Sequence, residues 1–290
     1  MLSIQNLTKR YGTLTALDHV SFEVKQGELF GLIGPDGAGK TTLFRLLTTL
    51  MRPDEGSATV DGFDIVTDYK AIRTVVGYMP GRFSLYQDLS VEENLEFFAS
   101  LFGTTVDEGY DLIAPIYRQI EPFKTRRAGR LSGGMKQKLA LSCALVHKPR
   151  VLFLDEPTTG VDAVSRSEFW DMLATLRKHG ITILVSTPYM DEASRCDRIA
   201  LINEGKILRI DTPTHITDEG ATLEDTFIRL IEEEKRTHLN LFEPPSCRVL
   251  HSPHIGTNQH SVDFLRPYSP CEGGLEVPRR TSLLSQLLHS

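Results

Sequence analysis

GPDGAGKTT, residues 34–42, is the stretch that decides the fold. It matches the phosphate-loop pattern G-x-x-x-x-G-K-[ST], follows the apolar run 29–34 and begins a helical pattern that stops before Pro53. In such a loop the glycines let successive backbone N–H groups face phosphate oxygens, and the helix amino terminus and a lysine add positive potential. The residues predicted to bind a nucleotide are Gly34, Pro35, Asp36, Gly37, Ala38, Gly39, Lys40, Thr41 and Thr42.

A carboxylate pair, Asp155-Glu156, ends the apolar pattern 151–155 (VLFLD). Because adjacent residues of a strand point in opposite directions, Asp155 can face a metal ion while Glu156 reaches an attacking water. Such a pair is more often structural when it stands alone, but the phosphate loop upstream favours a catalytic role. The sequence therefore predicts Mg²⁺ binding by Asp155 and the Thr41 hydroxyl, and ATP hydrolysis assisted by Glu156.

Residues 1–236 alternate short apolar runs with helical patterns, which is typical of an α/β sheet with crossover helices. Strands are predicted over 18–24, 29–34, 74–79, 151–155, 181–186 and 198–203. Helices are predicted after Lys40 and over 91–102, 107–120, 135–147 and 164–179.

The segment 237–290 is rich in Pro, Ser and His and lacks Lys, so we expect a poorly ordered tail without a core of its own. Its scattered His and Cys residues match no closed tetrahedral metal site. The four cysteines of the chain show no Cys-x-x-Cys spacing, which argues against a disulfide framework and a zinc site: Cys143, Cys196, Cys247 and Cys271.

Charge and hydropathy limit the partners and the location. The formal net charge is −6 and no Lys/Arg block stands out, so nucleic acid is not expected as a partner. No stretch approaches the ~20 apolar residues of a spanning helix, and the start of the chain lacks an export-signal pattern. We therefore expect a cytoplasmic protein.

The most specific string is LSGGMKQKLAL, residues 131–141, directly before a predicted helix. Together with the phosphate loop, the acidic strand and TTGVD (158–162), it makes the chain resemble the ATP-binding subunit of ABC transporters over about residues 2–231. The resemblance implies a P-loop NTPase core, a RecA-like sheet flanked by helices. It also implies an N-terminal antiparallel β subdomain and a helical signature subdomain over about 83–147. Residues 1–236 would form this ATP-binding domain.

The resemblance further implies that two such domains pair head to tail, as a homodimer or a heterodimer. Each ATP then lies between one phosphate loop and the partner's signature, where Ser132, Gly133 and Gly134 present donors at a helix start. Tyr11 would offer its ring to adenine, a contact of about 1–3 kcal/mol by analogy with base stacking. Asp162 would lie near the dimer seam; alone it could equally be a loop turn.

Two positions depart from the family's pattern. The glutamine expected in GYMPGRFSLYQDL is Gly81, and the histidine expected in ILVSTPYMDEA is Pro188, which has neither a polar side chain nor an N–H. Loss of one preorganised donor typically lowers a rate by about 10²–10³. We therefore expect slow hydrolysis at this chain's own phosphate loop, while its signature serves a partner.

The region 83–103 is rich in aromatic residues, and in the family it forms a groove for short helices of integral membrane permease subunits; core packing is the alternative. Residues 223–231 resemble the closing helix of ABC-2-type exporters of drugs, lipids or polysaccharides, which favours export. The expected location is then the inner face of the cell membrane. The change of composition after 236 is also consistent with a truncated form of a tandem-fused relative.

Two other functions remain open at this stage. One is a catalytically impaired nucleotide-binding partner of a second ABC ATPase, motivated by Gly81 and Pro188. The other is a soluble ABC ATPase that acts on ribosomes or DNA. Leu131 follows Lys40 by 91 positions, which leaves no room for the long coiled coil of the DNA-repair members.

Overall fold

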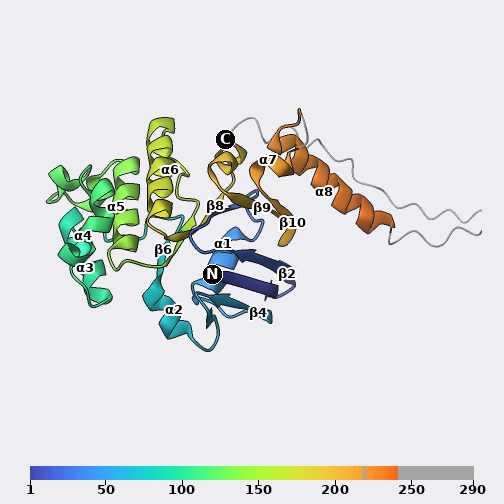
Figure 1. Cartoon of the computed structure of the whole chain (residues 1–290), viewed down its shortest axis with the longest axis horizontal. Helices are drawn as coiled ribbons and strands as arrows, with labels where there is room; N and C mark the ends of the chain where they lie inside the picture. Colours follow the sequence, from blue (N-terminus) through green and yellow to red (C-terminus); the bar gives the residue numbers. More distant parts are fainter. Residues whose placement is uncertain (218–219, 241–290) are drawn as a thin grey trace, which may run out of the picture. The chain divides into compact units, whose positions relative to one another are not determined.

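The computed structural model describes residues 1–217 and 220–240 (Figure 1). Most of the predicted tail, 237–290, therefore lies outside the described residues, together with Cys247, Cys271 and the histidines of that segment. Residues 237–240 are the exception, because they belong to the last helix, α8 (Leu223–Asn240). The predicted boundary after residue 236 stays a prediction.

A six-stranded sheet carries the chain's nucleotide motifs. Its strand order is β10-β9-β3-β8-β7-β6, and all neighbours are parallel except the antiparallel pair β9–β10. The strands are β3 (Leu29–Ile33), β6 (Val76–Met79), β7 (Val151–Asp155), β8 (Thr182–Thr187), β9 (Arg198–Asn203) and β10 (Lys206–Asp211). The strand predicted over 74–79 was too long at its start, because residues 74 and 75 end the short helix α2 (Tyr69–Val75).

A second, antiparallel sheet has the order β2-β1-β4-β5 and confirms the expected β subdomain. Its strands are β1 (Leu2–Tyr11), β2 (Leu14–Val24), β4 (Glu55–Val60) and β5 (Phe63–Asp64). Only part of β2 was predicted. The register of β1 shifts several times along β2, and Asn6 has a left-handed φ of 49°, so the alternation that marks a strand is interrupted.

The five helices predicted from periodicity are present, with ends within a few residues of those expected: α1 (Lys40–Leu47), α3 (Val91–Leu101), α4 (Val106–Tyr117), α5 (Gly133–Leu145) and α6 (Ala163–Lys178). Helices α3, α4 and α5 gather on one side of the sheet, away from β2 and β4 (Figure 1). Ser90 begins α3 with a capping box, because its hydroxyl accepts the Glu93 N–H while the Glu93 carboxylate accepts the Ser90 N–H. Short 3₁₀ turns cover Glu121–Phe123, Ala128–Arg130 and Met190–Arg195, and helix α7 (Pro213–Ile216) precedes α8.

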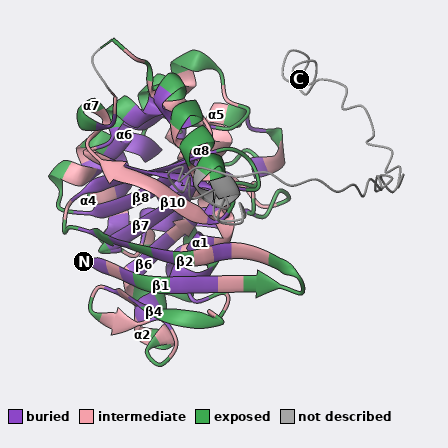
Figure 2. Ribbon diagram, turned by 90° about the vertical axis from the view of Figure 1, so that its right-hand side faces the viewer, coloured by how far each residue is buried: buried purple, intermediate pink, exposed green. Residues whose placement is uncertain are grey.

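Alternation along the buried strands divides the core into two clusters. Leu152 and Leu154 of β7 belong to the cluster that contains apolar residues of α3–α6, whereas Val151 and Phe153 belong to the cluster with β1, β2 and α1. Successive strand residues face opposite sides, so the helices cover one face of the parallel sheet, and α1 with the antiparallel sheet covers the other. Figure 2 shows the buried strands of the parallel sheet at the centre, whereas strands of the antiparallel sheet carry exposed stretches. Buried Cys143 and Cys196 carry free thiols, and burial raises the pKa of each.

Helices α4 and α5 approach closely at Gly109. A Cβ built on Gly109 would lie 2.2 Å from the backbone oxygen of Val146, so only glycine fits without a shift of backbone.

We expect Gly109→Ala to lower the free energy of unfolding by about 1–3 kcal/mol, because overpacking outweighs the ~1 kcal/mol gain in helix propensity. Urea unfolding of the full chain measures it. Asp111→Ala, on the exposed side of the same helix, is the control and should stay within about 0.5 kcal/mol of wild type. A stabilised Gly109→Ala variant would contradict the close contact.

Candidate functional site

The phosphate loop connects β3 to α1 at the carboxyl edge of the parallel sheet. Gly37 and Gly39 have left-handed φ values of 79° and 104°. A Cβ on Gly39 would lie 2.5 Å from the Ala16 oxygen, and one on Gly34 would lie 2.1 Å from the Ile202 oxygen. Glycine is therefore favoured by conformation at Gly37, by close packing at Gly34 and by both at Gly39. No side chain caps the amino end of α1, so its backbone N–H groups remain available to an anion.

Lys40 is held inside the loop by three oxygens. Its side chain is 3% exposed, and Nζ donates to the carbonyls of Gly34 at 2.8 Å and Pro35 at 2.9 Å. The third oxygen is Oε1 of Glu156, at 3.0 Å. The structure thus brings two predicted site residues from distant parts of the sequence into direct contact. A phosphate that binds Lys40 must compete with the Glu156 carboxylate.

The acidic pair lies at the end of β7, with Asp155 inside the strand and Glu156 just after it. Asp155 is the last strand residue and is 3% exposed, whereas Glu156 has left the strand with a left-handed φ of 49°. The two carboxylates contact different groups, since Asp155 accepts a hydrogen bond from Ser186 and Glu156 pairs with Lys40. Ser186 of β8 contacts both residues: its hydroxyl donates to Asp155 Oδ1 at 2.8 Å and accepts the Glu156 N–H at 3.0 Å.

The oxygens at this edge suit Mg²⁺. Thr41 is the second residue of α1, and Asp155 is the last residue of β7. Both residues therefore lie at the same edge of the sheet. Mg²⁺ prefers oxygen ligands and is usually held by one or two protein groups plus substrate phosphates and water. Among the described residues no group of three or more His, Cys, Asp or Glu side chains could hold a metal by itself. The residues present therefore fit a cation that arrives with a nucleotide.

The predicted signature residues begin helix α5. Ser132 is its N-cap and accepts the Met135 N–H at 3.4 Å, while Gly133 and Gly134 form the first turn. A Cβ on Gly134 would lie 2.8 Å from Ser165 Oγ, near the start of α6. The start of the signature helix therefore packs against the segment that follows the chain's own acidic pair.

Tyr11 and Asp162 lie at exposed positions. Tyr11 ends β1, is 41% exposed and donates its hydroxyl to the Met51 sulfur at 3.2 Å, which leaves its ring accessible to adenine. Asp162 is the N-cap of α6, and its carboxylate accepts the Ser165 N–H at 3.0 Å. This hydrogen bond is the main cause of the lowered pKa of Asp162. Asp162 thus has a structural role, and its place at a dimer seam stays a prediction.

The two atypical positions have defined surroundings. A Cβ on Gly81 would lie 2.9 Å from the Asp155 backbone oxygen, so this loop approaches the acidic pair more closely than a residue with a side chain allows. Pro188 follows Thr187, whose hydroxyl donates to buried Glu192 and accepts the Tyr189 N–H. The Arg166 guanidinium lies 4.9 Å from the centroid of the Tyr189 ring.

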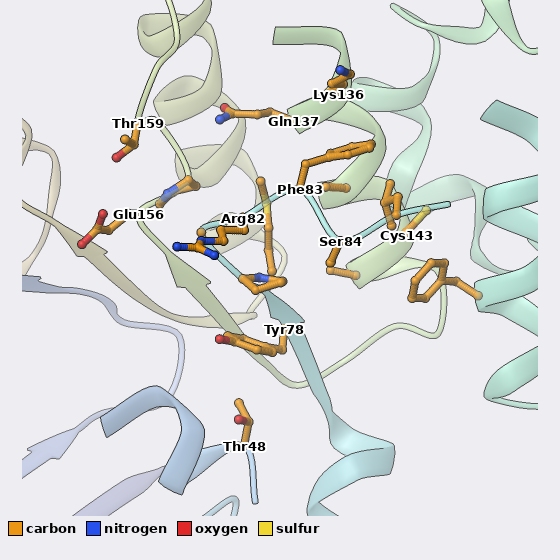
Figure 3. Close-up of a pocket in the computed structure, with 18 of the residues that line it drawn as sticks. Thr48, Tyr78, Arg82, Phe83, Ser84, Lys136, Gln137, Cys143, Glu156 and Thr159 are labelled. Atoms are coloured by element: carbon orange, nitrogen blue, oxygen red, sulfur yellow. The ribbon is translucent and has the colours of Figure 1, made fainter. Parts of the chain in front are cut away.

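A cavity of about 730 Å³ runs between the sheet edge and helices α3 and α5 (Figure 3). Its apolar wall includes Phe83, Phe98, Leu101, Phe102 and Ala140. Its other end reaches Glu156, Pro157 and Thr159. We call this cavity the lobe groove. Phe83 and Phe98, two of the aromatic residues of the predicted partner groove, therefore line a cavity that also reaches Glu156, whereas Tyr86 and Phe97 do not line it.

Sequence reasoning missed His147 and Arg82, which also line the lobe groove. The His147 ring stacks on Phe102 at 3.7 Å, and Nε2 donates to the Val76 carbonyl at 3.1 Å. Burial lowers the pKa of His147. Figure 3 shows Arg82 on the same side of the groove as Glu156. Arg82 directly follows Gly81 in the atypical segment GYMPGRFSLYQDL, where sequence reasoning assigned it no role, and His147 lies outside every motif.

The geometry defines a P-loop nucleotide-binding protein with an acidic pair suited to triphosphate hydrolysis. Residues 17–159 match the family described as ABC transporter. The chain is 38% identical over 236 residues to the doxorubicin resistance ATP-binding protein DrrA of Mycobacterium tuberculosis (strain H37Rv), covering 80% of this chain and 70% of that protein. The chain belongs to the ABC transporter family.

Other relatives agree on the family. The probable multidrug ABC transporter ATP-binding protein YbhF of Escherichia coli (strain K12) is 41% identical over 252 residues, covering 83% of this chain. This chain spans only 43% of the YbhF length. The Nod factor export ATP-binding protein I of Burkholderia thailandensis (strain ATCC 700388 / DSM 13276 / CCUG 48851 / CIP 106301 / E264) is 40% identical over 215 residues, covering 73% of this chain and 71% of that protein.

Solved structures confirm the fold. An ATP binding subunit of an ABC transporter superposes with a TM-score of 0.72 at 28% identity, covering 80% of this chain and 99% of that one. The dimeric ATP-binding cassette MJ0796 bound to ADP and Pi superposes with a TM-score of 0.66 at 25% identity, covering 73% of this chain and 98% of that one. The predicted P-loop NTPase core is confirmed.

We expect Glu156→Gln to lower single-turnover ATP hydrolysis by about 10²–10⁴-fold, because the amide cannot accept a proton from water. ATP binding should persist or strengthen, since the variant no longer offers Lys40 a charged competitor. Filter binding and quenched-flow assays separate the two effects. The control is Glu168→Gln, which alters an exposed carboxylate paired with Lys138 and should change neither. An unchanged hydrolysis rate in Glu156→Gln would rule out Glu156 as the base.

Proposed function

We propose that this chain is the ATP-binding subunit of an exporter, in which binding and hydrolysis of Mg²⁺-ATP drive separate membrane subunits. The observation that carries the proposal is the meeting of Lys40 and Glu156 at 3.0 Å, beside the uncapped start of α1. The names of the relatives, which refer to multidrug transport, doxorubicin resistance and Nod factor export, support an export role. Titration of the purified full chain with ATP and Mg²⁺ tests the binding step.

Each predicted site residue has a separate role in the proposed reaction. The loop residues 34–42 bind the phosphates, Lys40 exchanges Glu156 for a phosphate oxygen, and Tyr11 contacts the adenine. Thr41 and Asp155 hold Mg²⁺, which neutralises charge on the phosphates when it is bound. Released from Lys40, Glu156 is free to accept a proton from the attacking water.

A second ATP-binding domain completes the site. Ser132, Gly133 and Gly134 begin a helix of 13 residues, whose N–H groups and dipole favour an anion. In a head-to-tail pair this end of α5 would face the nucleotide of the partner. The partner is a second copy of this chain or a related chain.

The lobe groove is the proposed docking place for a short helix of a membrane subunit. Its rim carries apolar side chains that are unusually exposed: Leu101 is 61%, Leu50 57% and Phe102 39% exposed. A contiguous apolar rim of this kind is typical of interaction sites. No helix of the described residues has the length and apolar character needed to cross a membrane. We infer that the chain works at the inner face of the cell membrane, bound to permease subunits.

Gly81 and Pro188 support slow hydrolysis at the chain's own loop. A second candidate function follows from them: a catalytically impaired partner that binds ATP and lends its signature to another ABC ATPase. The relatives' names give no support to a ribosomal or DNA-repair function.

We expect Pro188→His to raise single-turnover hydrolysis by about 10-fold or more, because it supplies the missing donor near the terminal phosphate; loss of such a donor costs about 10²–10³. Pro188→Ala is the matched control, since it restores the backbone N–H without the imidazole and should not accelerate hydrolysis. Equal single-turnover rates for wild type and Pro188→His would contradict the idea that the missing donor at position 188 slows hydrolysis.

We expect Leu101→Asp to reduce co-sedimentation with membranes that contain the permease subunits by about 10-fold, because a charge would be buried against apolar surface on docking. The affinity for ATP should remain unchanged. Ile228→Asp is the control, because Ile228 is similarly exposed, at 56%, but lies on α8 and does not line the groove. Equal membrane binding of both variants and wild type would exclude the lobe groove as the docking site.

A further inference from the structure

Ser186 connects both carboxylates of the acidic pair to the neighbouring strand. It is fully buried in β8 and lies opposite Asp155 in the parallel register of β7 and β8. Its hydroxyl donates to Asp155 Oδ1 at 2.8 Å and accepts the Glu156 N–H at 3.0 Å. The same N–H also lies 3.1 Å from the Ser186 carbonyl oxygen. One residue thus holds the carboxylate of Asp155 and the backbone of Glu156.

Each contact has a physical consequence. A hydrogen bond to a charged carboxylate is stronger than one between neutral groups, so the hydroxyl fixes the orientation of Asp155. It does so without adding a positive charge that would repel a cation. Glu156, with φ at 49°, is in a conformation that costs a non-glycine residue about 1–2 kcal/mol. The two oxygens of Ser186 around its N–H stabilise that conformation.

The next residue ties the same strand end to the phosphate loop. The Thr187 carbonyl accepts the Gly34 N–H at 3.3 Å, and the Thr187 hydroxyl accepts the Tyr189 N–H beyond Pro188 at 3.0 Å. The end of β8 therefore contacts the phosphate loop, the acidic pair and the segment that carries Pro188. Pro188 has no group that can donate a hydrogen bond. At this end of β8, the Ser186 hydroxyl donates a hydrogen bond to the acidic pair, at Asp155.

We propose that Ser186 is a positioning residue, which orients Asp155 toward Mg²⁺ and Glu156 toward water. The inference rests on the proposed ATPase function and assigns a role to Ser186, which precedes the atypical Pro188 by two positions and is not one of the predicted site residues. Residues that hold a metal ligand in place typically contribute about 10–100-fold to metal affinity or activity. Substitution of a residue that only stabilises the fold would reduce the amount of folded protein. It would not change how nucleotide binding and hydrolysis by the folded protein depend on Mg²⁺.

The test compares Ser186→Ala with Ser186→Thr, which keeps a hydroxyl, and with Thr182→Val. Thr182 lies four residues earlier on the same strand, is equally buried, and accepts the Gly27 N–H at 2.9 Å. Thermal unfolding reports the fold of each full-length variant. Fluorescent ADP is then titrated with and without Mg²⁺, and single-turnover hydrolysis is measured across Mg²⁺ concentrations.

We expect Ser186→Ala to need about 10-fold more Mg²⁺ for half-maximal ADP binding and half-maximal hydrolysis. Its affinity for ADP in EDTA should be unchanged. Ser186→Thr should show the wild-type Mg²⁺ dependence. Thr182→Val should lower the melting temperature but leave the Mg²⁺ dependence unchanged. An unaltered Mg²⁺ dependence in Ser186→Ala, or an equal shift in Thr182→Val, would overturn the positioning role alone. Absence of nucleotide binding by the wild-type chain would instead overturn the proposed function as well.

Discussion

The parallel register of β3, β8 and β7 is the constraint on which the rest of the site depends. It places Ile33 opposite Thr187, and Asp155 opposite Ser186. Because parallel strands end at one edge of the sheet, the phosphate loop, the acidic pair and the Ser186–Pro188 segment follow one another along that edge. Residues separated by more than a hundred positions then come within hydrogen-bond distance, as Lys40 and Glu156 do.

The ion pair of Lys40 and Glu156 gives the loop a defined state without nucleotide. A buried cation without a partner is costly, and two carbonyls with one carboxylate satisfy the ammonium group here. A phosphate can replace the carboxylate with little loss of electrostatic stabilisation. In the function we propose, this exchange would link occupation of the loop to release of Glu156, which would then be available to the attacking water.

Local patterns explain which features were predictable. The phosphate loop, the acidic strand, the signature and the five helices predicted from periodicity each depend on residues close together in sequence, and the observed elements lie close to the predicted positions. Strands β1 and β4 were missed because they are half-exposed and irregular in register. Glu156's left-handed turn, the contact of Gly81 with Asp155 and the role of Ser186 depend on backbone brought close by the fold, and ILVST by itself reads as an ordinary buried strand.

The absence of a side chain at Gly134 has a mechanical consequence. With a Cβ position only 2.8 Å from Ser165 Oγ, the first turns of α5 and α6 pack closely against each other. Helix α6 begins soon after the chain's own acidic pair, whereas α5 faces the nucleotide of the opposite subunit in a head-to-tail dimer. In the head-to-tail dimer we propose, a displacement caused by turnover at one site would be transmitted to the other through this contact of two helix starts.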